Sequence, residues 1–134
     1  MKDLFFFYGT LRLGCPISTV VLKNAKYITT ITLQGKLYLT KDKYPLFVPG
    51  KEGLVIGDIF EVPASLIDQL DEYEEINSPH SPYERVKFNK NNITFWVYAA
   101  KKEFSKKLNE LKVIPSGDWL NYIKQHRKNS LFSA

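Results

Sequence analysis

One carboxylate of this chain falls on the apolar side of a predicted helix. Pro63 suits the first position of a helix, and at about 100° per residue the apolar side chains that follow it share one arc: Leu66, Ile67, Leu70 and Tyr73. Glu74 lies four residues after Leu70 and seven after Ile67, so helical phase places it inside this arc. The other acids of the segment fall largely outside it: Asp68, Asp71, Glu72 and Glu75.

An acid in that position has the chemistry of a proton-transfer group. Burial of a carboxylate is unfavourable unless the group is paired, hydrogen-bonded or protonated, and it raises the pKa towards neutrality. Such a group can act as a general acid or base, which makes Glu74 the candidate catalytic residue. Two other interpretations stay open: a structural ion pair with Arg85 or Arg12, or a helix that ends before Glu74.

The start of the chain predicts a buried strand that ends in a loop. Residues 4–8 are large and apolar, and Gly9 follows them directly. Such a run, bounded by a turn signal, is typical of a strand inside a sheet, and glycine lets the backbone turn without a Cβ. Free backbone N–H groups after Tyr8 could bind a small anion or a carbonyl. The alternative is a core strand that ends in an ordinary turn.

Further elements follow from the pattern of β-branched and aromatic residues. We expect strands over 27–32, 35–39, 54–62, 83–89 and 93–100, helices over 16–25, from 63 and over 118–128, and irregular segments over 44–50 and 78–82. The prolines at 45 and 49 are the reason for a loop over 44–50, and residues 89–92 are the expected hairpin turn. Trp96 and Tyr98 share one face of their strand and are candidates to line a pocket, although core packing is the commoner role of such rings.

Length and composition narrow the class of protein. With 134 residues the chain is expected to form one domain, residues 1–134. Its single cysteine cannot form an internal disulfide, and neither His80 nor His126 has metal-ligand neighbours, so no metal site is expected. With no leader and no long apolar run, the protein is expected to be soluble and cytoplasmic, without a membrane partner.

The net charge of +5 lies entirely in the last quarter of the chain. Residues 1–100 carry 11 basic and 11 acidic side chains, whereas residues 101–134 carry 8 and 3. A nucleic-acid interface is one interpretation. A solvated basic face is favoured, because the lysines are spread through an amphipathic pattern without stacking aromatics. We therefore expect no nucleic-acid partner.

Six short motifs, in order along almost the whole chain, resemble those of the γ-glutamylcyclotransferase-like proteins, which include the γ-glutamylaminecyclotransferases. They are Tyr8-Gly9-Thr10-Leu11, Tyr44-Pro45 with Pro49-Gly50, Gly57-Asp58-Ile59-Phe60-Glu61-Val62, Leu70-Asp71-Glu72-Tyr73-Glu74, Tyr83-Glu84-Arg85 and Ser116-Gly117-Asp118-Trp119. Each motif alone is weak evidence, but six in register are a specific signal. One position departs from the pattern: Glu75 stands where such proteins commonly have glycine directly after the catalytic glutamate.

The resemblance implies a mixed α/β (α+β) fold, with a small, partly closed β-barrel of mixed strands and a few surrounding helices. It implies that Glu74 is the catalytic carboxylate, and that the γ-glutamyl group binds at one loop: Tyr8, Gly9, Thr10 and Leu11. The expected partner is a small-molecule γ-glutamyl substrate, and the protein is expected to be a monomer or weak homodimer.

The implied reaction closes the γ-glutamyl group into 5-oxoproline and releases a free amine, with no metal or organic cofactor. The substrate's own α-amine is the nucleophile, so no serine or cysteine is required, and a carboxylate moves the protons. The alternative is a catalytically silent module that keeps the fold and binds a ligand or a protein. The leaving amine is left open.

Overall fold

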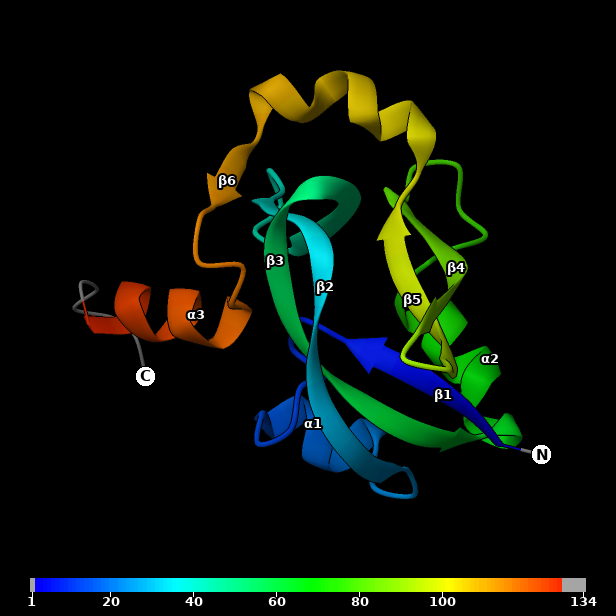
Figure 1. Ribbon diagram of the computed structural model, residues 1–134. Helices are drawn as coiled ribbons and strands as arrows, with labels where there is room; N and C mark the ends of the chain where they lie inside the picture. The colour runs from blue at the N-terminus through cyan, green and yellow to red at the C-terminus, as the bar shows by residue number, and fades with distance from the viewer. Residues whose placement is uncertain (1, 129–134) are drawn as a thin grey trace.

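The computed structural model describes residues 2–128, which form a six-stranded mixed sheet curled into a partly closed barrel (Figure 1). The strands are β1 (Lys2–Phe7), β2 (Lys26–Leu39), β3 (Pro45–Pro63), β4 (Tyr83–Lys90), β5 (Ile93–Ala100) and β6 (Lys112–Ile114), in the order β4-β5-β1-β3-β2-β6. The helices are α1 (Pro16–Val21), α2 (Ala64–Tyr73), the 3₁₀ helix η1 (Lys102–Glu110) and α3 (Trp119–Lys128). This confirms the α+β class and the partly closed barrel expected from the sequence.

The apolar opening run forms β1, near the centre of the sheet. It pairs antiparallel with β3 and parallel with β5. Phe5 and Phe7 pack on one face, in the core that also receives side chains of α1 and α2. Phe6 and Tyr8 pack on the other face, in the core that receives Trp119 of α3. Because both faces of β1 are covered, residues 4–7 of this strand are all apolar instead of alternating.

The predicted loop over 44–50 is wrong, because β3 begins at Pro45. Pro45 pairs with Leu39 of β2, and Pro49 pairs with Gly35. The neighbouring strand β1 pairs only with residues 58–63 of β3, so this first part of β3 has a partner on one side. Proline lacks a donor for a second partner and is therefore tolerated at such an edge.

The strands predicted over 27–32 and 35–39 are two parts of β2. A register shift separates them, since Gln34 pairs with Leu54 but Gly35 pairs with Pro49. Gly35 has a φ of +149°, and a Cβ there would lie 2.5 Å from the carbonyl oxygen of Val48. Only glycine fits this bend, which curls β2 and β3 together and helps to close the barrel.

The predicted hairpin is confirmed. β4 and β5 pair from Tyr83 with Ala100 to Lys90 with Ile93. The turn is shorter than the predicted 89–92, because Asn89 and Lys90 still pair in β4; it consists of Asn91 and Asn92, whose φ values are 54° and 67°. Two residues with positive φ match the twist of the flanking strands, and asparagine adopts that conformation readily.

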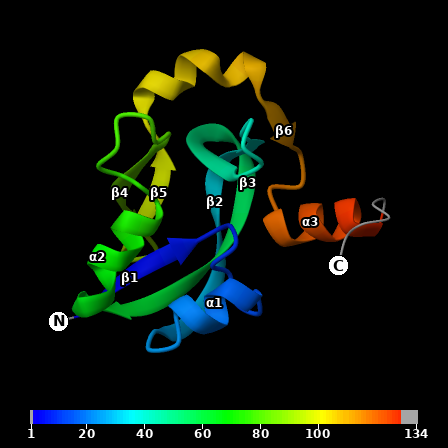
Figure 2. The ribbon, with the colours of Figure 1, turned by 180° about the vertical axis from the view of Figure 1, so that it is seen from behind.

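The helices follow the prediction at α2 and α3 and depart from it elsewhere. α2 begins one residue later than predicted, because Pro63 still pairs with Lys2 in the β1–β3 ladder. α1 ends at Val21 and is shorter than the predicted helix over 16–25. The sequence did not indicate η1 and β6: η1 arches from β5 to β6, and β6 pairs with residues 37–39 of β2 (Figures 1 and 2). No helix within residues 2–128 has the length and apolar character needed to cross a membrane.

Candidate functional site

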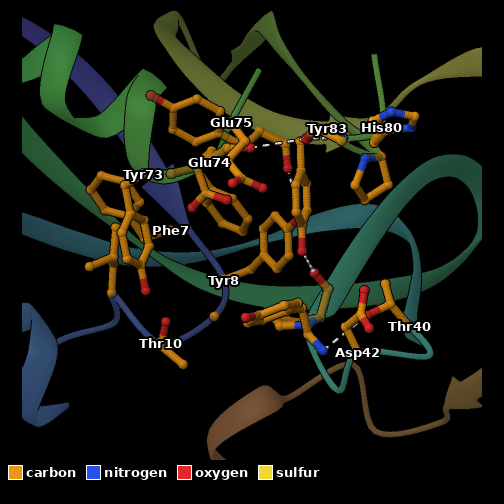
Figure 3. Close-up of a pocket in the computed structure, with 18 residues that line it drawn as sticks. Phe7, Tyr8, Thr10, Thr40, Asp42, Tyr73, Glu74, Glu75, His80 and Tyr83 are labelled. Atoms are coloured by element: carbon orange, nitrogen blue, oxygen red, sulfur yellow. Dashed lines mark hydrogen bonds between the residues drawn. The ribbon is translucent and has the colours of Figure 1, made fainter. Parts of the chain in front are cut away.

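A cavity of about 430 Å³ lies where β1 ends (Figure 3). Its walls come from the loop after β1, the turn between β2 and β3, the end of α2 and the segment that leads into β4. The lining residues are Phe6, Phe7, Tyr8, Gly9, Thr10, Leu11, Thr40, Asp42, Tyr44, Pro45, Tyr73, Glu74, Glu75, His80, Ser81, Pro82, Tyr83 and Tyr98. The structure thus brings all five predicted site residues to one cavity, although Glu74 is far from the others in sequence.

Glu74 keeps helical phase beyond the last residue of α2. Its backbone is in the right-handed helical region, with φ −84° and ψ −3°. Its N–H donates to the carbonyl oxygen of Leu70 at 2.9 Å, which is a regular i to i−4 bond. The side chain therefore points to the side of the helix that the apolar arc predicted. It lies among Tyr8, Tyr73 and Tyr83 at the cavity (Figure 3). The helix does end before Glu74, but the backbone of Glu74 still has helical geometry.

No arginine neutralises this carboxylate. Arg12 pairs instead with Asp58 and Asp118, and Arg85 pairs with Asp71. Among residues 2–128 no ion pair or hydrogen bond to the Glu74 carboxylate is formed. Burial raises the pKa of Glu74 from 4.5 to about 7. The half-buried group can therefore gain or lose a proton near neutral pH.

Glu74 also makes the stability of the fold depend on pH between 4.5 and about 7. In the unfolded chain the carboxyl titrates near 4.5, whereas in the folded protein its pKa is about 7. As the pH rises through this window, the unfolded state releases the proton first, so the free energy of unfolding falls. We expect Glu74→Gln to remove this loss. The free energy of unfolding of the variant, relative to that of the parent, should therefore be higher at pH 8 than at pH 4 by roughly 2 kcal/mol. Urea unfolding of both proteins at the two pH values measures the difference. A difference that does not change with pH would contradict the burial of this carboxyl.

Two further tyrosines close the cavity around Glu74. The Tyr83 hydroxyl donates to the carbonyl oxygen of Pro45 at 2.5 Å. Burial, and then the nearby charge of Glu74, raises the pKa of Tyr83, so its hydroxyl stays protonated and keeps donating. Tyr98 lines the cavity as expected, and its hydroxyl donates to Asp71 at 2.7 Å.

Trp96, the other ring proposed as pocket-lining, does not reach the cavity. It lies beneath two cations, with Arg85 at 4.7 Å and Lys87 at 4.9 Å from the ring centre. Arg85 in turn pairs with Asp71, the residue that accepts the Tyr98 hydroxyl. This cluster therefore supports the back of the site.

Some groups of the loop after β1 anchor it in the fold, and others are available to bind a ligand. Tyr8 is 5% exposed; its hydroxyl donates to the carbonyl oxygen of Tyr98 at 2.6 Å and accepts the N–H of Phe47 at 3.2 Å. Leu11 is buried in the core. The Thr10 side chain and the backbone N–H groups of Thr10 and Leu11 donate to no acceptor within the part of the chain that the structure describes. These groups can bind an anion or a developing oxyanion, whereas the Tyr8 and Leu11 side chains hold the loop in place.

Gly9 is required for space rather than for a left-handed backbone. Its φ is not positive, which differs from the expected reason for glycine at this turn. A Cβ at this position would lie 2.8 Å from Cγ of Pro45, a contact too close for any side chain. The loop after β1 and the start of β3 are therefore packed directly against each other.

A buried charge network anchors the far end of this loop. Arg12 donates through Nε to Asp58 and through Nη1 to Asp118, each at 3.1 Å. Asp58 is 2% exposed and also accepts the N–H of Leu13 at 2.8 Å and the hydroxyl of Thr30 at 2.6 Å. Two of the sequence motifs, through Asp58 and Asp118, thus meet in one network with Arg12, which directly follows a third motif, although their spacing gave no sign of it.

Glu75 occupies a position suited to glycine. Its φ is +54°, in the left-handed region that ordinary residues adopt at a cost of about 1–2 kcal/mol. This positive φ explains why the γ-glutamylcyclotransferase-like proteins commonly have glycine directly after the corresponding glutamate. This chain makes the turn with a charged residue at the cavity wall.

The sequence missed the part of the wall that comes from the β2–β3 turn. Asp42 and Tyr44 line the cavity from the turn before β3, where the sequence placed only Tyr44 in a loop, and His80 lines it from the segment between two prolines. Only the tertiary fold brings these segments to the end of α2. Within residues 2–128 no three side chains of the metal-ligating types His, Cys, Asp and Glu come together as a metal site.

Comparison with known proteins gives a family match over most of the chain. A family model described as gamma-glutamyl cyclotransferase, AIG2-like, matches residues 5–121. Gamma-glutamylaminecyclotransferase A of Danio rerio is 35% identical over 79 residues, which are 52% of this chain and 49% of that protein. The matched region thus spans about half the length of this curated relative.

Solved structures share the fold. An uncharacterized protein from Pyrococcus horikoshii has a TM-score of 0.70 at 22% identity, over 94% of this chain and 97% of that one. An AIG2-like protein from Mus musculus has a TM-score of 0.62 at 23% identity, over 78% and 82% of the two chains. At these identities the likeness concerns the fold.

Proposed function

The chain belongs to the AIG2-like gamma-glutamyl cyclotransferase family, and on this premise we propose that it is an active enzyme that cyclises the γ-glutamyl group of a γ-glutamyl amine or peptide. The products are 5-oxoproline and a free amine. The observation that carries the proposal is Glu74, a half-buried carboxylate without an ion-pair partner among the described residues, whose pKa is raised to about 7 at a cavity wall.

The proposed reaction uses the substrate's own nucleophile. Ionised Glu74 takes a proton from the α-amine of the γ-glutamyl group. The amine nitrogen attacks the γ-carbonyl carbon, a new C–N bond closes the five-membered lactam, and the bond to the leaving nitrogen breaks. Glu74 then gives the proton to that nitrogen, so that the carboxylate is regenerated.

The cavity contributes by holding the substrate folded. The N–H groups of Thr10 and Leu11 are suited to bind the α-carboxylate or the oxygen that becomes negative in the transition state. Placing amine and carbonyl in contact removes entropy from the barrier, which for ideally oriented intramolecular reactions amounts to about 7–11 kcal/mol.

The alternative is a silent module that binds a ligand on the same fold. Such a module has no use for an acid with a raised pKa, and burial of that acid lowers the stability of the fold near neutral pH. The retention of Glu74 in this environment therefore favours the enzyme.

A panel of γ-glutamyl compounds tests the proposal. We expect release of 5-oxoproline, detected by mass spectrometry, from at least one γ-glutamyl amine or peptide. The value of kcat/KM should fall as the pH drops below about 7, because the proton-accepting form of Glu74 is lost. Binding of 5-oxoproline without turnover of any compound would favour the silent module.

A further inference from the structure

A buried serine joins the backbone of Glu74 to the strand that carries Tyr83. Ser81 is 3% exposed, and its hydroxyl donates to the carbonyl oxygen of Glu74 at 3.0 Å. The Ser81 hydroxyl oxygen in turn accepts the N–H of Tyr83 at 3.2 Å. The hydroxyl has one proton to donate, and that proton is directed to the main chain of the candidate catalytic residue.

The connection continues across the cavity. The Tyr83 hydroxyl donates to the carbonyl oxygen of Pro45, and the Pro45 ring packs against Gly9. Ser81 therefore stands in an unbroken series of contacts from Glu74 on one wall to the loop after β1 on the other. That loop presents the N–H groups of Thr10 and Leu11. The series of contacts therefore connects the proton-transfer group to the candidate anion site.

Glu74 depends on such an anchor more than a residue inside a helix does. It lies just beyond α2, and the next residue turns away with a positive φ. Residues 75–82 form neither helix nor strand in the structure. The carboxylate has no ion pair among residues 2–128, and two main-chain bonds hold Glu74 itself: its N–H donates to Leu70, and its carbonyl oxygen accepts the Ser81 hydroxyl.

We propose that Ser81 is a positioning residue, whose hydroxyl holds the Glu74 carboxylate at the point of the cavity where the α-amine of the substrate reacts. The proposal rests on the proposed cyclotransferase function, and it adds a residue that does not touch the substrate's reacting atoms. A displacement of about 1 Å can lower a rate about 10²-fold, so the loss of one such bond is measurable in turnover.

The test compares two serine variants from the same segment. Ser81→Ala removes the hydroxyl from the series, whereas Ser78→Ala removes a hydroxyl that accepts the N–H of His80 in an exposed turn, at 3.2 Å. We expect Ser81→Ala to lower kcat about tenfold or more while KM changes less than twofold. We expect Ser78→Ala to keep the parental kcat. The folded fraction of each variant, measured by NMR, corrects the rates for lost protein.

A second measurement does not require turnover. Titration of the Glu74 carboxyl carbon by NMR in Ser81→Ala should show a pKa below the parental value of about 7, because the released side chain reaches water. If the parent protein turns over no γ-glutamyl compound, the proposed function fails, and this titration alone decides the role of Ser81. An unchanged Glu74 titration in Ser81→Ala overturns the positioning role. The positioning role is also overturned if the loss of kcat in Ser81→Ala equals its unfolded fraction, or if Ser78→Ala shows the same loss.

Discussion

Glu74→Gln is expected to abolish most turnover while the protein remains folded. Glutamine has nearly the volume of glutamate and fits the same wall of the cavity, but an amide cannot accept and return a proton. Loss of a general acid or base typically lowers the rate about 10²–10⁴-fold. The value of kcat on the best γ-glutamyl compound of the panel measures the effect, and binding of 5-oxoproline is expected to persist.

Glu72→Gln is the matched control for this variant. Glu72 is exposed, lies two residues earlier in the last turn of α2 and does not line the cavity. The same change of charge there is expected to leave kcat within about twofold, since surface substitutions away from special features have small effects. Full activity of Glu74→Gln on a confirmed substrate would remove Glu74 from the mechanism, and unfolding of this variant would make the carboxylate a structural residue.

Arg12→Met is expected to cause the largest loss of stability. It removes the cation from a pair with Asp58, and the side chains of the two residues are 9% and 3% exposed. Breaking a buried pair by removing one partner costs about 3–5 kcal/mol, because the remaining charge is buried without compensation. Urea denaturation measures the change in the free energy of unfolding.

Arg85→Met provides the comparison. Its pair with Asp71 has the same 3.1 Å separation, but the side chains are 26% and 16% exposed, so water screens the charges. We expect a loss of about 1 kcal/mol or less there. Equal losses for the two variants would show that the Arg12 network does not anchor the loop after β1 as its burial indicates.

The sequence was sufficient for the features that depend on local pattern. The apolar run before Gly9 identified β1, helical phase identified Glu74, and the two asparagines of the β4–β5 turn matched a hairpin. These signals depend on residues within a few positions of one another, where periodicity and turn chemistry act directly. Helical phase predicts the direction of Glu74 although α2 ends at Tyr73, because the phase continues for one more residue.

The features that the sequence did not indicate depend on distant contacts. Pro45 indicated a loop, and only the absence of a second neighbour for the start of β3 makes it compatible with a strand. Gly9 indicated an unusual backbone, whereas its requirement comes from the ring of Pro45. The role of Arg12 requires Asp58 and Asp118 to meet, and neither charge pattern nor spacing carries that information.

The central place of β1 has a consequence for how the chain is made. β1 leaves the ribosome about 90 residues before its parallel partner, the strand that contains Trp96 and Val97. At about 5–20 residues per second, the Phe5-Phe6-Phe7 segment waits roughly 5–20 s for that neighbour. Its uncharged, proline-free run from Leu4 to Tyr8 is the kind of strand that pairs with other chains when left open. The strand that leads into the cavity is therefore also a segment of the nascent protein that needs protection from aggregation.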